Sequence, residues 1–246
     1  FRYEPALHAA DNIMTFKLAV KTIAKRHGMH ATFMPKPKSG VSGSGMHINM
    51  SLRKDGRNIF ADETDRFGLS QDAYYFIGGL MKHVYSRTAI TNPLVNSYKR
   101  LVSGFEAPLH ITWSVTNRSP LIRIPSSFGS GTRIELRSPD SAANPYLTIA
   151  LCLAAGLDGI KNKITPPENI QKNIFHMTEE EKEQLHIKSL PTNLYDAVCA
   201  MERDAFIREI LGEHISNVYI GSKKDEWDRY CKTVTEWEVD TYLDKF

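Results

Sequence analysis

Two short stretches in which polar and apolar residues strictly alternate place the tightest limits on how this chain can fold. Residues 46–52 read Met-His-Ile-Asn-Met-Ser-Leu, and residues 132–138 read Thr-Arg-Ile-Glu-Leu-Arg-Ser. Successive side chains of a β-strand point to opposite faces of its sheet. Each stretch is therefore predicted to be a strand with one apolar face for the core and one polar face.

The polar faces carry unusual residue types. The first presents His47, Asn49 and Ser51, and the second presents Arg133, Glu135 and Arg137. A neutral imidazole and a carboxylate are suitable ligands for a divalent ion, and arginines bind phosphate or carboxylate oxygens. If both faces line one cavity, they suit a metal–nucleotide complex. The alternative, which is the commoner one when only spacing is considered, is a solvated face with a cross-strand ion pair.

Two further segments are candidates for a site. The loop Ser42-Gly43-Ser44-Gly45 precedes the first strand, and its glycines allow close approach of a ligand to the backbone. It lacks the pattern of a P-loop, so a flexible turn remains the alternative. The proline- and glycine-rich segment 92–125 is predicted to be an active-site loop because of its charged residues, of which four are candidates for a site, with surface charge as the alternative. The four candidates are Arg100, Glu106, Arg118 and Arg123.

Composition excludes several classes of protein. The 31 basic and 28 acidic residues are well mixed, which argues against a dedicated nucleic-acid binder. The longest mainly apolar stretch, Tyr146–Leu157, is too short for a bilayer, which needs about 20 residues. Three widely separated cysteines suggest neither a disulfide framework nor a zinc site, and a reducing cytoplasm is expected.

Helical periodicity and capping residues predict most of the remaining elements. Helices are expected over 10–27, over 70–88, from the Asn144-Pro145 cap to 163, after the Thr178–Glu181 capping box, over 196–211 and over 224–243. The helix from 146 to 160 is apolar on nearly all sides and is predicted to be buried. Strands are expected over 110–116 and 121–124. The prolines at 166 and 167 divide a sheet-bearing part, 1–164, from a helical part, 165–246, of the same domain.

Several motifs resemble those of glutamine synthetase, in particular the bacterial type I enzyme of low-GC Gram-positive bacteria. They are Gly43-Ser44-Gly45-Met46-His47, Asn96-Ser97-Tyr98-Lys99-Arg100-Leu101, Gly104-Phe105-Glu106-Ala107-Pro108, Asn117-Arg118-Ser119, Ile122-Arg123-Ile124-Pro125, Arg133-Ile134-Glu135-Leu136-Arg137 and Ala142-Ala143-Asn144-Pro145-Tyr146. The resemblance covers essentially the whole chain in the same order. It implies an α+β fold with a curved, mainly antiparallel sheet, flanking helices and a helical C-terminal region.

The resemblance implies an ATP-dependent ligase that phosphorylates the γ-carboxylate of glutamate and lets ammonia displace the phosphate, with Mg²⁺ or Mn²⁺ as cofactor. By resemblance the metal ligands are His47 and Glu135. The glutamate-binding residues are Ser42, Gly43, Arg100, Glu106, Arg118 and Arg137. The nucleotide-binding residues are Asn49, Ser51, Arg118, Arg123 and Arg133. The catalytic residues are Glu106, which closes over the site on a flap, with Arg118 and Arg137.

The chain departs from the family pattern at three places. Ser42 replaces the usual Asn, and Phe175 lies near a tyrosine that is adenylylated in one subgroup. In the family, the other metal ligands and an N-terminal β-grasp domain lie upstream of the matched region. We therefore expect this polypeptide to be a catalytic-domain fragment that does not form glutamine alone.

The resemblance also implies a homo-oligomer, a dodecamer for the complete enzyme, without a membrane or nucleic acid as partner. One alternative is a relative that joins glutamate to a polyamine-type amine. Another is an additional role as an interaction module, in which the aromatic C-terminal segment 221–246 contacts nitrogen-responsive transcription factors.

Overall fold

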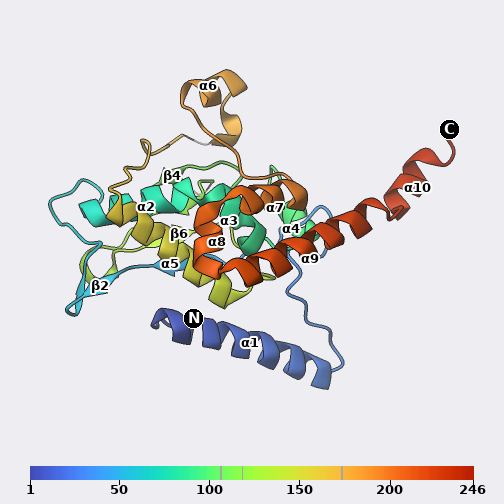
Figure 1. Ribbon diagram of the computed structural model, residues 1–246, viewed down its shortest axis with the longest axis horizontal. Helices are drawn as coiled ribbons and strands as arrows, with labels where there is room; N and C mark the ends of the chain where they lie inside the picture. Colours follow the sequence, from blue (N-terminus) through green and yellow to red (C-terminus); the bar gives the residue numbers. More distant parts are fainter. Residues whose placement is uncertain (106, 118, 173) are drawn as a thin grey trace.

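The computed structural model describes residues 1–105, 107–117, 119–172 and 174–246. Its main sheet has the strand order β1 (Ile48–Met50), β6 (Ile134–Leu136), β5 (Ile122–Arg123) and β4 (Trp113–Ser114). β1 with β6 and β6 with β5 are antiparallel, whereas β5 with β4 is parallel. Helices make up most of the rest of the body (Figure 1), so the predicted α+β class and mainly antiparallel sheet are confirmed. The strands are shorter than the alternation predicts.

One face of the sheet forms part of the hydrophobic core. Ile122 and Ile48 both lie opposite Leu136, and Ile122, Ile134 and Leu136 are fully buried. Ile48 and Met50 are half-buried and pack against the same core. The alternation in the sequence therefore assigns the apolar face correctly.

A second hairpin follows β1. It pairs β2 (Arg53–Lys54) with β3 (Arg57–Asn58) across a turn at Asp55 and Gly56, which both have positive φ. Asp-Gly favours this two-residue turn because both positions tolerate the left-handed conformation.

The tightest helix packing joins α2 (Gln71–Lys82) to α5 (Pro145–Lys161). A Cβ atom on Gly159 would lie 2.0 Å from the Tyr75 carbonyl oxygen, and one on Gly79 would lie 2.1 Å from that of Ala155. Only glycine permits this approach. The cap predicted for α5 is confirmed, because the Asn144 side chain accepts hydrogen bonds from the first N–H groups of the helix.

Two helix predictions for this region are wrong. The expected helix over 70–88 is divided at His83 into α2 and α3 (Val84–Thr91). His83 Nε2 lies 2.8 Å from Asp158 Oδ2, and its ring stacks on Phe206, so tertiary contacts fix the break. The helix α5 is not buried on all sides, because Tyr146, Leu153 and Leu157 are exposed. Its outer side lies towards α1 (Ala6–Arg26), below the body in Figure 1.

The region after residue 167 is mainly helical, as predicted. It contains η2 (Ile174–His176), α6 (Glu179–Gln184), α7 (Leu194–Arg203), α8 (Ala205–Leu211), α9 (Glu213–Cys231) and α10 (Glu236–Tyr242). The expected helix over 196–211 is broken at Asp204, whose side chain caps α8. The expected helix over 224–243 is broken before Thr235, which caps α10. The Thr178–Glu181 capping box is confirmed.

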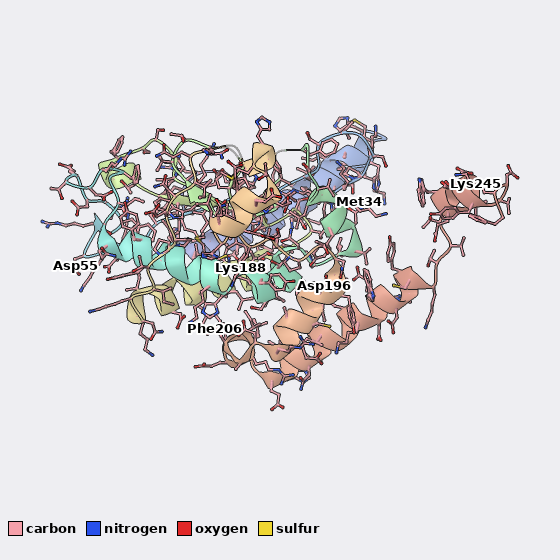
Figure 2. The ribbon with its side chains drawn as sticks, turned by 90° about the horizontal axis from the view of Figure 1, so that it is seen from above. Met34, Asp55, Lys188, Asp196, Phe206 and Lys245 are labelled. Atoms are coloured by element: carbon pink, nitrogen blue, oxygen red, sulfur yellow. The ribbon has the colours of Figure 1, made fainter. Side chains whose placement is uncertain are left out.

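The helical region is joined to the sheet-bearing region by hydrogen bonds and by packing. Trp113 Nε1 donates to the Pro167 carbonyl at 2.7 Å, and Ile111 N donates to that of Lys188 at 2.7 Å. α7 packs against α3 and α9. In contrast, α10 extends away from the body, and Figure 2 shows Lys245 at the opposite end of the molecule from Asp55.

Among the described residues, no helix is both long and apolar enough to cross a membrane. Cys152, Cys199 and Cys231 are free.

Candidate active site

Polar residues from three neighbouring strands share the second face of the sheet. Glu135 on β6 lies directly opposite Asn49 on β1 and directly opposite Arg123 on β5. Side chains at directly opposite positions of antiparallel strands project from the same face. The two predicted polar strand faces therefore meet on one surface, and Arg123 extends it onto a third strand.

Glu135 is the centre of this polar row. Its side chain is buried, with Oε1 3.1 Å from His47 Nδ1 and Oε2 2.6 Å from Arg123 Nε. A buried carboxylate is stable only when hydrogen bonds and opposite charge replace its hydration. The structure thus brings together the two residues expected to bind the metal.

The surroundings of His47 favour the neutral imidazole. Burial and the nearby Arg137 guanidinium lower the pKa of His47, and Glu135 only partly opposes this shift. A histidine must be neutral to bind a metal ion. The electrostatics of the site are therefore compatible with metal binding at this imidazole.

The pair fits part of a coordination sphere. Within the described ranges, no cluster of three or more His, Cys, Asp or Glu side chains is suited to hold a metal ion. An imidazole nitrogen and a carboxylate oxygen would supply two ligands, whereas Mg²⁺ prefers about six, usually including water and phosphate oxygens. His47 and Glu135 can therefore hold a divalent ion only together with other ligands.

Three of the residues expected to bind nucleotide line a groove of about 620 Å³ beside β1. They are Asn49, Ser51 and Arg133, and His47 lines the same groove. Arg133 Nε donates to Asn49 Oδ1 at 3.1 Å, and its Nη1 donates to the Gly131 carbonyl at 3.1 Å. These contacts fix the Arg133 side chain across β1 and β6.

Arg123 has a different place from its neighbours. It is not among the residues that line the groove, and it forms the cross-strand ion pair with Glu135. The cross-strand ion pair of the alternative interpretation is therefore present, but Glu135 is buried, so the face is not solvated at this point. The predicted contact of Arg123 with ATP phosphates stays a prediction.

The glycine-containing loop lies directly on Arg100. A Cβ atom on Gly43 would lie 2.5 Å from the Pro35 carbonyl oxygen and 3.0 Å from Arg100 Cγ. Arg100 is 5% exposed and donates through Nη1 to the Ser138 carbonyl at 2.7 Å and through Nη2 to that of Arg137 at 3.1 Å. The loop is therefore packed against a fixed arginine and is not a free turn, while Ser42 itself is exposed.

Residues 95–100 differ from the sequence prediction. They form the helix α4 (Val95–Arg100), whereas an irregular active-site loop was expected from 92 onwards. The Ser97 side chain accepts a hydrogen bond from Leu94 N, which fixes the first turn. As a consequence, Arg100 is presented from a helix end.

Three residues with expected catalytic or substrate roles remain. Arg137 is 5% exposed, and its Nη1 lies 3.5 Å from the Pro120 carbonyl oxygen. Glu106 and Arg118 lie outside the described residues. The roles assigned to all three stay predictions.

Sequence reasoning missed a buried polar pair behind the site. Asn92 Nδ2 donates to the Ser138 carbonyl at 2.8 Å and to Asp140 Oδ2 at 3.1 Å. Burial raises the pKa of Asp140, and its hydrogen bond with Ser97 partly offsets this shift. The pair ties the end of α3 to the chain after β6. The only signal in the sequence was the position of Asp140 just after a strand.

The family model for the glutamine synthetase catalytic domain matches residues 1–242 of this chain. The chain belongs to this family. The resemblance seen in the motifs is thereby confirmed. Glutamine synthetases from Clostridium saccharobutylicum and Staphylococcus aureus are each 55% identical to it over 246 residues. The glutamine synthetase of Methanosarcina mazei is 56% identical over 243 residues.

The chain spans only part of these glutamine synthetases. It is covered completely by the Clostridium and Staphylococcus enzymes and to 99% by the Methanosarcina enzyme, but it corresponds to only 54–56% of their lengths. Among solved structures, GmaS in complex with ADP has a TM-score of 0.89 at 42% identity, and apo GmaS has a TM-score of 0.87 at 42% identity. Each comparison covers 99% of this chain and 56% or 55% of the GmaS chain.

Proposed function

We propose that the complete protein containing this chain is a ligase that joins ammonia to the γ-carboxylate of glutamate. The reaction consumes ATP and gives glutamine, ADP and phosphate. Membership of the glutamine synthetase catalytic-domain family supports this proposal. The glutamine synthetases that it matches extend beyond the region equivalent to this chain, so the proposal concerns the whole protein.

The observation that carries the proposal is the Glu135 arrangement. One buried carboxylate contacts an imidazole on one side and a guanidinium on the other. Residues that line the neighbouring groove can donate hydrogen bonds to phosphate oxygens. Phosphoryl transfer depends mainly on positioned positive charge around the migrating group, so such a surface suits it.

In the first step, a γ-carboxylate oxygen of glutamate attacks the terminal phosphorus of ATP. A new oxygen–phosphorus bond forms, the bond to the bridging oxygen breaks, and ADP leaves with that electron pair. We assign the orientation of the γ-carboxylate and the migrating phosphoryl group to Arg118 and Arg137, and that of the nucleotide to Asn49, Ser51, Arg118, Arg123 and Arg133. Arg100, with Ser42 and Gly43, is assigned to the amino-acid end of glutamate. A bound Mg²⁺ or Mn²⁺, held in part by His47 and Glu135, would supply additional positive charge to the phosphates.

In the second step, ammonia attacks the acyl carbon and phosphate leaves with the electron pair of the broken carbon–oxygen bond. The nitrogen must lose a proton, and we assign this proton to the carboxylate of Glu106. The acyl phosphate would otherwise react with water, so exclusion of water is part of the mechanism. A segment that closes over the site provides this exclusion.

The test is a reaction balance on the purified full-length protein. Incubation with glutamate, ATP, Mg²⁺ and ammonium should give glutamine, ADP and phosphate in equal amounts. The same assay with putrescine or ethanolamine distinguishes the alternative, a glutamate–amine ligase. Faster product formation with an organic amine than with ammonium would select that alternative, and no product with any of the three would refute the ligase.

We further propose that the 246 residues act as one domain and do not form glutamine on their own. The contacts between the sheet-bearing and helical regions support one domain. Within the described residues, the proposed metal ligands His47 and Glu135 fall short of a complete coordination sphere. The isolated chain should therefore show no glutamine synthesis under conditions where the full-length protein is active.

We also propose a cytoplasmic homo-oligomer, a dodecamer for the complete enzyme, whose C-terminal segment contacts nitrogen-responsive transcription factors. The free cysteines are typical of a reducing compartment. Trp237, Tyr242 and Leu243 are exposed on the protruding end and are suited to a contact. Deletion of 237–246 should abolish regulator binding while the oligomer stays intact, and unchanged binding would refute the role.

A further inference from the structure

Lys36 is a buried lysine with an uncommon set of contacts. It is 9% exposed, its ammonium lies 3.6 Å from the centroid of the Phe105 ring, and it donates a hydrogen bond to the Val41 carbonyl. Lysines are rarely buried, because their charge loses hydration. A ring face and a carbonyl oxygen replace part of that hydration here. The side chain is therefore held between the glycine-containing loop and the segment that carries Phe105.

The backbone of the same residue is tied to α4. Lys36 N donates to Asn96 Oδ1 at 2.8 Å, and Asn96 Nδ2 donates back to the Lys36 carbonyl at 3.0 Å. Asn96 lies one helical turn before Arg100. Directly before Lys36, the Pro35 carbonyl accepts a hydrogen bond from Ser44 N at 2.8 Å.

Lys36 thus connects three segments to which the proposed function assigns glutamate or its amidation. These are the loop with Ser42 and Gly43, the helix α4 with Arg100, and the segment with Glu106, which directly follows Phe105 in the chain. The backbone of Lys36 binds Asn96 of α4. Its side chain contacts both the Val41 carbonyl, directly before Ser42, and the Phe105 ring. Lys36 has no expected contact with substrate, so its effect is exerted through its neighbours.

We propose that Lys36 is a positioning residue that holds Phe105 against the glutamate-binding loop. The inference rests on the proposed function. Loss of this contact leaves ATP-dependent phosphorylation possible but releases Phe105 from that loop and gives water easier access. Water then competes with ammonia for the acyl phosphate, and phosphate is released without glutamine.

The experiment compares single variants of the full-length protein. K36M keeps the length of the side chain without its charge, and F105L keeps an apolar side chain without its ring. Both should raise the KM for ammonium and the ratio of phosphate to glutamine by about tenfold, because a buried cation–ring contact is of that strength. F105Y, which keeps the ring, should behave as the wild type.

Controls separate positioning from folding. Lys38 lies on the same loop but is exposed, so K38M should leave both quantities unchanged. The K36M/F105L double variant should be no worse than either single variant, because both remove one contact. Unfolding temperatures, measured in parallel, identify variants whose loss of activity follows a loss of folded protein.

Three outcomes would overturn the inference. The first is an active wild type and a K36M variant whose KM for ammonium and ratio of phosphate to glutamine are both within twofold of the wild-type values. The second is an F105L variant with the wild-type ratio of phosphate to glutamine, which would mean that the ring is not needed. The third is a loss of activity in K36M that matches its loss of folded protein, while the ratio of phosphate to glutamine stays at the wild-type value. A wild-type protein that forms no glutamine would instead refute the proposed function, and this inference with it.

Discussion

Two buried charged side chains of this molecule lie in contrasting surroundings. On the sheet face, Glu135 has an imidazole at 3.1 Å and a guanidinium at 2.6 Å. In helix α3, Arg87 is fully buried and donates through Nη2 to the Leu80 carbonyl at 3.4 Å, while within the described residues its Nε and Nη1 have no hydrogen-bond partner. The paired charge lies in the candidate active site, and the poorly paired one lies in the helical core.

The two environments give a buried charge different energetic consequences. A paired charge becomes costly mainly when its partner is removed, whereas an unpaired one lowers stability in the intact protein. We therefore expect substitutions at the two places to have opposite effects. Replacing Glu135 should impair the protein, and replacing Arg87 should stabilise it.

The largest effect is expected for E135Q. Glutamine keeps the size of the side chain but loses the charge that faces His47 and Arg123. Glutamine formation by the full-length protein should fall by about 100-fold or more, the usual cost of losing a metal ligand or a major electrostatic contact. Steady-state assays at saturating substrates measure this, and E63Q, at an exposed glutamate, is the matched control. Activity of E135Q within tenfold of the wild type would contradict the assignment.

The next effect is expected for R87M. Methionine fills much of the same space without a charge, so the free energy of unfolding should rise by about 1–4 kcal/mol. In a protein of this size, 1 kcal/mol shifts the melting temperature by about 2–4 °C. Thermal unfolding measures the change, with R26M on the exposed side of α1 as control. A lower melting temperature for R87M would contradict the unfavourable contribution assigned to the buried Arg87 charge.

A smaller effect of opposite sign is expected for N144A, at the N-cap of α5, the helix that packs against α2. Unlike Arg87, Asn144 has its polar group satisfied, because its side chain accepts from the N–H groups of Tyr146 and Leu147. Removing this cap should lower the free energy of unfolding by about 1 kcal/mol. Urea unfolding should show it, and a transition that coincides with the wild type would contradict the role of the cap.

The smallest effect is the pH dependence contributed by His47. Its pKa is lowered in the folded protein, so the folded state binds fewer protons than the unfolded state, in which the pKa is about 6.5. The stability associated with the neutral imidazole is present above about pH 6.5 and is lost as the pH falls towards the folded-state pKa. H47Q should therefore lose less stability than the wild type between pH 7 and 5. Equal losses in urea titrations at both pH values would contradict the lowered pKa.

The sequence predicted those features that depend on local periodicity and capping. Alternation placed Ile134 and Leu136 in the core and Glu135 on the polar face. Capping residues such as Asn144 marked helix starts, because their side chains satisfy the N–H groups nearby in the chain. The family motifs, which occur in the expected order along the whole chain, predicted the family.

Features fixed by distant contacts could not be read from the sequence. The break at His83 depends on Asp158 and Phe206, which are far away in the chain. The exposed side of α5 has the same apolar composition as its buried side, so composition could not distinguish them. The position of Arg123 opposite Glu135 follows from strand order, which alternation does not specify.

The most direct measurement is a crystal structure of the full-length protein with Mn²⁺ and ADP, in which anomalous scattering locates the metal. A peak about 2.0–2.3 Å from both an imidazole nitrogen of His47 and a carboxylate oxygen of Glu135 is expected, with the nucleotide phosphates beside it. A peak bound elsewhere, with His47 and Glu135 still in direct contact, would show that this face of the sheet does not hold the ion.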